Sequence, residues 1–238
     1  MRILITNDDG IDAPALPHFV NWAKKLGEVT VVAPKYGQSG KSQAIDFYRE
    51  IEIKKRDFEG CEAYAVDSTP ADCVRFATFG LHRTYDLVLS GINSGYNLGH
   101  DVVYSGTVGA AFEAARRGMK ALAFSSEENI FSFALEELDG IYAFITEKEL
   151  LKHTSVLNVN IPPQKSLGIR ITQQGENFYA DQFVHRGNDI YAQIGDPVYR
   201  ENDDVTFDVS AVRNGYISIT PLTEKRTDFA AYEILKNI

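Results

Sequence analysis

Two adjacent carboxylates, Asp8 and Asp9, follow the first apolar run of the chain, residues 2–6, with Asn7 between. Neighbouring negative charges repel each other and are costly to hold together unless a cation or a proton lies between them. Carboxylate oxygens are hard ligands, which suit magnesium, manganese or calcium. Read alone, the sequence Asn-Asp-Asp-Gly at residues 7–10 is equally compatible with a simple turn, because all of these residue types favour turns.

Two further polar clusters follow later strand-like runs. The loop at residues 34–42 is rich in Gly and Ser, and a hydroxyl from Ser39 or Ser42 could complete a metal shell. The longer loop at residues 90–107 contains Asn93 and Asn97, whose side chains offer neutral oxygens. Ligands of open α/β sheets bind beyond the carboxyl ends of the strands, where all three clusters are expected to meet.

The long loop ends in Ser105, Gly106 and Thr107, which lead into a predicted helix at 107–117. A helix start has free backbone N–H groups and, with small residues, is a ready site for an anion. The sequence therefore predicts a cation site that faces an anion site at one edge of one sheet. The chemistry that this arrangement favours is phosphoryl transfer to water.

Alternating strands and helices must position these clusters. Apolar runs and helical spacings predict strands at 2–6, 28–33, 45–53, 63–66, 86–90 and 121–125, and helices at 16–26, 69–80 and 107–117. This alternation predicts an α/β fold with a doubly wound, mostly parallel sheet over residues 1–154. From about residue 155, strand-like runs follow one another, so residues 155–238 are expected to form a β-rich part with a hairpin around 183–199 and a closing helix at 228–237.

The composition excludes several classes of function. The 238 residues carry a formal net charge of −9, whereas nucleic-acid polymers and anionic membranes attract basic surfaces. No stretch reaches the roughly 20 apolar residues that span a bilayer, and the N-terminal run lacks the features of a signal peptide. Cys61 and Cys73 match no zinc spacing. A cytoplasmic protein that acts on a small molecule is expected.

Five segments together resemble the SurE (survival protein E) family of metal-dependent nucleotide phosphatases. They are NDDGIDAP (7–14), VVAPKYGQSGKS (31–42), STPADCV (68–74), SGINSGYNLGHDVVYSGTVGAA (90–111) and GYISITPL (215–222). The segments occur in the order of the family and cover nearly the whole chain. Ala15, Ser68 and Ala114 depart from glycines that are common in the family, and the first two lie where they could change loop shape near the pocket.

The resemblance implies a Rossmann-like core and hydrolysis of nucleoside 5′- and 3′-monophosphates, with activity on short polyphosphate in some members. It implies a homodimer or homotetramer built by exchange of segments in the β-rich part. The metal ligands of the family correspond to Asp8, Asp9, Ser39 and Asn93, and the expected ion is Mg²⁺ or Mn²⁺, with Ca²⁺ as a further occupant.

Roles can be assigned within this set as a hypothesis. Asp8 and Asp9 bring the negative charge, and Asp9 is favoured to orient the attacking water. The backbone at Ser105, Gly106 and Thr107, together with Asn97, is expected to bind the phosphate oxygens.

Other functions must explain the same residues. A phosphorelay receiver would need a phospho-accepting aspartate where this chain has Asn93. A haloacid-dehalogenase-type phosphatase needs two aspartates separated by one residue, but Asp8 and Asp9 are adjacent. A dinucleotide-binding oxidoreductase would show GxGxxG after the first strand, where Gly10 stands alone. A metal-dependent nucleotide sensor remains as an alternative function. It differs from the enzyme because it would bind a nucleotide without releasing phosphate.

Overall fold

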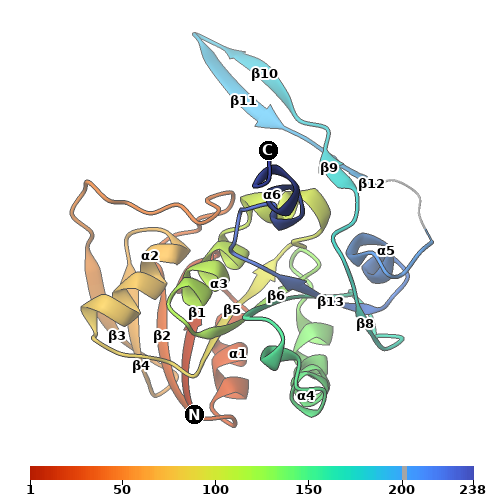
Figure 1. Ribbon diagram of the computed structural model, residues 1–238. Coiled ribbons are helices and arrows are strands. Elements are labelled where there is room, and N and C mark those ends of the chain that lie inside the picture. Colours follow the sequence, from red (N-terminus) through yellow and green to blue (C-terminus); the bar gives the residue numbers. More distant parts are fainter. Residues whose placement is uncertain (200–202) are drawn as a thin grey trace.

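The computed structural model describes residues 1–199 and 203–238. Its main strands are β1 (Arg2–Thr6), β2 (Glu28–Pro34), β3 (Ile53–Phe58), β4 (Cys61–Val66), β5 (Leu87–Ser94), β6 (Lys120–Ser126), β7 (Val156–Ile161), β8 (Ile169–Ile171) and β13 (Ile217–Leu222). They form one sheet in the order β3-β4-β2-β1-β5-β6-β7-β13-β8 (Figure 1). From β4 to β7 all neighbours are parallel, while β3 pairs antiparallel with β4 and β13 antiparallel with β7. The mostly parallel sheet predicted from the sequence is confirmed.

Helices cover both faces of this sheet. Helices α1 (Leu16–Ala23) and α4 (Ser132–Glu147) pack on one face, and α2 (Pro70–Arg75) and α3 (Gly106–Arg116) pack on the other. Two further helices are α5 (Asp208–Arg213) and α6 (Phe229–Leu235), and η1 (Phe76–Gly80), η2 (Gly99–Tyr104) and η3 (Leu150–Lys152) are short helical segments. Thr69 caps α2, since its hydroxyl accepts a hydrogen bond from the backbone N–H of Asp72 at 3.1 Å. Among the described residues, no helix is long and apolar enough to cross a lipid bilayer.

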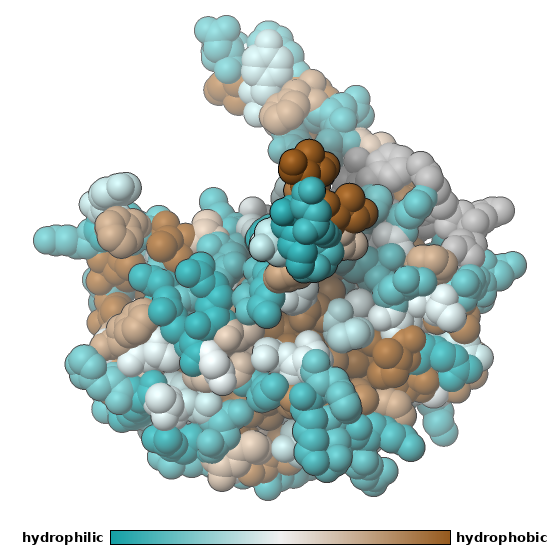
Figure 2. Space-filling model, viewed as in Figure 1, coloured by the Kyte–Doolittle hydropathy of each residue, from teal (hydrophilic) through white to brown (hydrophobic). Residues whose placement is uncertain are grey.

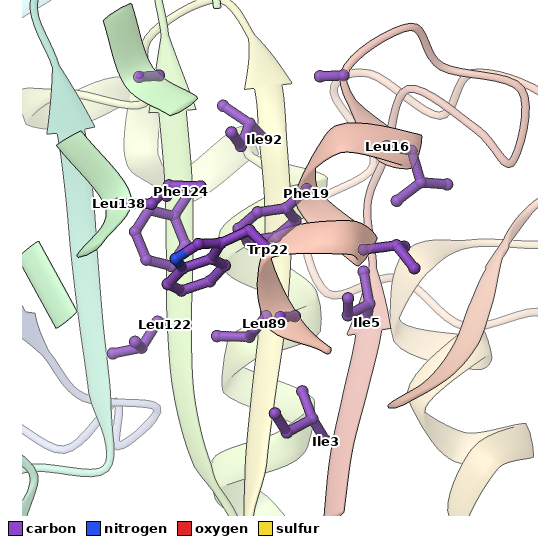
Figure 3. Packing of buried hydrophobic residues seen from close by; sticks show 14 of the residues in the cluster. Ile3, Ile5, Leu16, Phe19, Trp22, Leu89, Ile92, Leu122, Phe124 and Leu138 are labelled. Carbon is purple, nitrogen blue, oxygen red and sulfur yellow. The ribbon is translucent and has the colours of Figure 1, made fainter. Parts of the chain in front are cut away.

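The core consists of two apolar layers, one on each face of the sheet. On the side of α1 and α4, Phe19 stacks on Trp22 with ring centroids 5.5 Å apart, and Phe124 meets Phe19 edge-on at 5.4 Å (Figure 3). On the other side, α2 and α3 pack small residues such as Ala110 and Ala111 against the sheet. Because both faces are covered, the central strands are apolar nearly throughout.

Residues beyond 154 continue the same sheet, leave it as a hairpin and return to it in β13. Strand β7 pairs with β6, so the sheet runs without a break across the predicted boundary at 154/155. The antiparallel hairpin of β10 (Gln182–Gly187) and β11 (Ile190–Ile194) projects from the body (Figure 1), joined through β9 (Asn177–Tyr179) and β12 (Pro197–Tyr199). The predicted hairpin and closing helix are confirmed.

The strand predicted at 45–53 is wrong, because the strand begins only at Ile53. Residues 45–52 are irregular, since the backbone N–H of Asp46 donates to the Asp72 carboxylate at 2.7 Å and the Asp46 carboxylate accepts from Ser68 at 2.8 Å. These contacts fasten the segment to the start of α2 rather than to the edge of the sheet.

Candidate active site

The side chain of Asp8 lies buried at the carboxyl end of β1, only 3% exposed. Its Oδ1 accepts a hydrogen bond from the hydroxyl of Thr107 at the start of α3. Burial raises the pKa of Asp8 from 3.8 to about 6; the Thr107 hydroxyl lowers it, and the charge of Asp9 raises it further. The ionised carboxylate is therefore costly here, and a cation beside it would offset that cost.

Asp9 faces the neighbouring strand β5. Its Oδ2 accepts the backbone N–H of Ser94 at 3.0 Å, and burial still raises its pKa. Asn93 lies beside it and donates its Nδ2 to the carbonyl oxygen of Gly95 at 2.8 Å. This hydrogen bond uses the donor end of the amide, so the acceptor Oδ1, the end suited to a cation, points the other way.

The loop that carries Ser39 is fastened between the end of β1 and the end of η2, next to α3. The backbone N–H of Gln38 donates to the Asp8 carbonyl at 2.7 Å. Ser42 donates its N–H to the carbonyl of Tyr104 at 2.9 Å and its hydroxyl to that of Val103 at 2.7 Å. Ser39 itself is exposed to solvent. The structure thus holds the backbone of this loop next to Asp8, with Ser39 at the surface.

A glycine in α3 makes this attachment possible. A Cβ at Gly109 would lie 2.0 Å from the carbonyl oxygen of Ser42, so only glycine lets the loop approach the helix this closely.

The predicted phosphate-binding residues form the start of α3. The Ser105 hydroxyl accepts the backbone N–H of Val108 at 3.1 Å as the N-cap of the helix. Gly106 packs directly on Asp8, because a Cβ there would lie 3.0 Å from the Asp8 Cβ. The predicted cation ligand and the predicted anion site are therefore in contact across 99 residues of sequence, the separation of Asp8 and Thr107.

Asn97 is 8% exposed and lies deeper in the structure than the helix start. Its Nδ2 donates to the Ser125 hydroxyl at 2.8 Å, and its backbone groups are held by the side chains of Asn158 and Asn160. Its role as a phosphate contact stays a prediction.

An open cleft of about 350 Å³ adjoins the carboxylate of Asp9, a size that suits a small molecule. Its walls come from the β1–α1 loop, the ends of β2 and β5 and the loop before α4, namely Asp9, Gly10, Asp12, Ala13, Pro14, Ala15, Lys35, Ile92, Asn93, Ser94, Asn129 and Phe131. Asp9 and Asn93 thus face one common space. The departure at Ala15 lies in the wall of this cleft.

The donor set fits a hard divalent cation. Two adjacent carboxylates, one of them almost fully buried, meet neutral oxygen donors at one sheet edge, and Mg²⁺ or Mn²⁺ suits such oxygens. Within residues 1–199 and 203–238, there is no group of three or more His, Cys, Asp or Glu side chains that could hold a metal ion. The residues fit a site of two carboxylates completed by neutral ligands.

Sequence reasoning missed Thr107 as the partner of Asp8 and missed the polar side chains behind the long loop. Asn158 and Asn160 could have been noticed in the sequence, because they interrupt the otherwise apolar buried run VLNVNI.

Comparisons with known proteins show relatives of this chain over its full length. The family model described as "Survival protein SurE" matches residues 3–181. The protein named 5′-nucleotidase SurE of Desulforudis audaxviator is 38% identical over 251 residues, covering 99% of this chain and 96% of the relative. The protein of the same name from Legionella pneumophila is 36% identical over 247 residues, covering 100% and 97%. The crystal structure of the SurE protein from Aquifex aeolicus has a TM-score of 0.78 and 33% identity, covering 100% of this chain and 99% of that one.

Proposed function

This chain belongs to the SurE family, and we propose that it is a divalent-metal-dependent phosphatase that hydrolyses nucleoside 5′-monophosphates to nucleoside and phosphate. The observation that carries the proposal is the contact between Asp8 and the start of α3. It joins a buried carboxylate, which suits a cation, to a helix N-terminus, which suits a phosphate. The names of the relatives support the nucleotide as substrate.

The residues divide the work as follows. Asp8, Asp9, Ser39 and Asn93 would hold the cation, and the Thr107 hydroxyl fixes the orientation of Asp8. The backbone at Ser105, Gly106 and Thr107 would bind the phosphate oxygens at the helix start.

A divalent cation in such a site supplies electrostatic stabilisation of the phosphoryl oxygens and favours deprotonation of water. In the reaction, water adds to phosphorus, the bond from phosphorus to the ribose oxygen breaks, and that oxygen gains a proton. We propose that Asp9 orients the attacking water. The backbone N–H of Ser94 holds the Oδ2 of Asp9, and Oδ1 takes no part in that contact.

Further parts of the proposal come from the family resemblance. They are activity on nucleoside 3′-monophosphates and short polyphosphate, a cytoplasmic location, and a homodimer or homotetramer. Apolar side chains on the hairpin and α6 support association, because large exposed apolar surfaces favour interfaces. Figure 2 shows hydrophobic residues gathered near the C-terminus, where α6 lies. The large apolar residues that are exposed on the hairpin and in the C-terminal segment are Phe183, Ile190, Tyr191, Ile194, Phe229, Tyr232, Ile234, Leu235 and Ile238.

Phosphate release from 5′- and 3′-nucleoside monophosphates and polyphosphate tests the activity. The protein is first treated with EDTA and then supplied with Mg²⁺ or Mn²⁺. Asp8→Asn is the test variant, and Asp57→Asn makes the same chemical change on the exposed strand β3. We expect metal-dependent release that Asp8→Asn abolishes and Asp57→Asn retains. Binding of nucleotide without release of phosphate by the metal-loaded wild type would instead establish the sensor.

A further inference from the structure

Two asparagines stand in a strand where apolar residues are expected. Strand β7 is buried on both faces, and Asn158 and Asn160 are 0% exposed. Their neighbours Leu157 and Val159 point to the opposite face, into the core beside α1 and α4. A buried amide is costly unless it is hydrogen-bonded, so the partners of these two side chains indicate their purpose.

Both asparagines bind the backbone of one residue, Asn97. Asn160 accepts the Asn97 N–H at 2.9 Å through Oδ1 and donates Nδ2 to the Asn97 carbonyl at 3.0 Å. Asn158 donates to the same carbonyl at 2.8 Å. The backbone polar groups of Asn97 are therefore fixed by side chains more than 60 residues away, at separations of 61 and 63.

A second attachment follows two residues later, at Gly99. The carboxylate of Asp208, 0% exposed, accepts the N–H of Gly99 at 2.9 Å, while Gln174 donates to the Gly99 carbonyl at 2.8 Å. Asp208 also accepts the backbone N–H groups of Gly175 and Val209, each at 2.7 Å. One buried carboxylate thus joins the loop to two segments of the C-terminal part.

These attachments fall on the segment 95–107, the phosphate loop, which runs from the end of β5 to the start of α3. Residues 96–98, which precede η2, have no regular secondary structure and no hydrogen-bond ladder of their own, so side-chain partners fix the backbone there. Both held residues lie between Asn93, proposed as a cation ligand, and Ser105, where the proposed phosphate contacts begin.

We propose that Asn158, Asn160 and Asp208 are positioning residues that hold the phosphate loop in the shape needed for catalysis. The inference rests on the proposed function. It assigns to residues 155–238 a part in the active site of the same chain, beyond any part in association. None of these three side chains needs to touch the substrate, since each acts through the backbone of Asn97 or Gly99.

Variants with kinetic and exchange readouts test the proposal. Asn160→Ala removes the two hydrogen bonds that Asn160 makes to Asn97 and leaves that of Asn158. Asp208→Asn removes the charge and places an amide donor among backbone N–H groups. We expect kcat/KM to fall about tenfold to a hundredfold, since small displacements of bound groups have large effects on rate. The inhibition constant of inorganic phosphate should rise, and amide hydrogen exchange of residues 95–107 should accelerate.

Ser218→Ala is the matched control. The Ser218 side chain is buried in β13, opposite Asn160 of β7, and it shares a hydrogen bond of 2.7 Å with Thr172, which lies outside the phosphate loop. It should lose stability while kcat/KM and exchange of the loop stay at the wild-type values. Gln174→Met removes only the donor to the Gly99 carbonyl and tests the same loop if the buried variants do not fold.

The outcomes separate the two proposals. An active wild type whose Asn160, Asp208 and Gln174 variants keep wild-type kcat/KM, phosphate inhibition and loop exchange would overturn the positioning role. A wild type that binds phosphate but releases none from any nucleotide would overturn the proposed function. In that case, weaker phosphate binding in the variants would still support the positioning role, and unchanged binding would overturn it.

Discussion

The hydroxyl of Thr107 donates a hydrogen bond to the carboxylate of Asp8, and both side chains are nearly inaccessible to solvent. This contact connects the end of β1 to the start of α3. It sets the orientation of the carboxylate that we propose as a cation ligand, and it lowers the pKa that burial raises.

Thr107→Val keeps the shape of the side chain and removes this donor. We expect kcat/KM for a nucleoside 5′-monophosphate to fall about tenfold or more, because a hydrogen bond to a charged group is lost. Steady-state kinetics at saturating metal measure the effect. Thr107→Ser keeps the hydroxyl and should stay close to wild type; a valine variant as active as the serine variant would contradict the role.

The raised pKa of Asp8 makes the stability of the metal-free protein depend on pH. The folded state keeps the proton up to about pH 6, whereas an unfolded chain loses it near 3.8. The free energy of unfolding should therefore fall as the pH rises from about 4 to about 6, by about 3 kcal/mol from this residue. Urea unfolding in EDTA measures it. Asp8→Asn should show a smaller decrease over the same interval, and an identical decrease would contradict the assignment.

Addition of Mg²⁺ or Mn²⁺ after treatment with EDTA should stabilise the wild type at pH 7.5. At a metal concentration of 100 Kd the gain is about 2.7 kcal/mol, or about 5–10 °C in Tm for a chain of this size. Thermal unfolding followed by circular dichroism measures it. Asp9→Asn should lose most of the shift, and a variant stabilised as much as the wild type would remove Asp9 from the proposed site.

Gly106→Ala should damage activity more than stability. The new Cβ would lie 3.0 Å from the Cβ of Asp8 and 3.1 Å from its Oδ2, so the carboxylate must move. We expect a fall in kcat/KM of about tenfold or more. Gly140→Ala in α4 is the control, because a Cβ there has nothing within 4 Å; it should keep full activity and gain up to about 1 kcal/mol. Equal activities of the two variants would contradict the close contact.

The exposed apolar residues of the hairpin and α6 should be covered in solution by another copy of the chain. Light scattering coupled to size exclusion is expected to give a dimer or tetramer for the wild type. Phe183→Glu and Leu235→Glu, at positions 71% and 61% exposed, should each shift the mass to a smaller species. Asn237→Glu adds the same charge at a polar position and should not. A monomeric wild type would contradict association.

Local patterns in the sequence predicted much of the fold. Apolar runs and helical spacings located most central strands, the helix capped by Thr69 and the closing helix, because these signals depend on neighbours in sequence. The helix α4 was not predicted, although its buried residues Ala134, Leu138, Ile141 and Ile145 have regular helical spacing. The strand prediction at 45–53 was wrong. The alternation of residue types there is typical of a strand, but tertiary hydrogen bonds to Asp72 and Ser68 keep the segment irregular.

The sequence by itself determined the types of the candidate ligands and the sheet edge where they gather, since residues after parallel strands must meet there. Only the tertiary structure decided that Thr107 binds Asp8, that Gly106 packs on it, and that the loop is held by Asn158, Asn160 and Asp208. Such contacts join residues about 60 to 110 positions apart. Their partners depend on how whole elements pack, which no local pattern records.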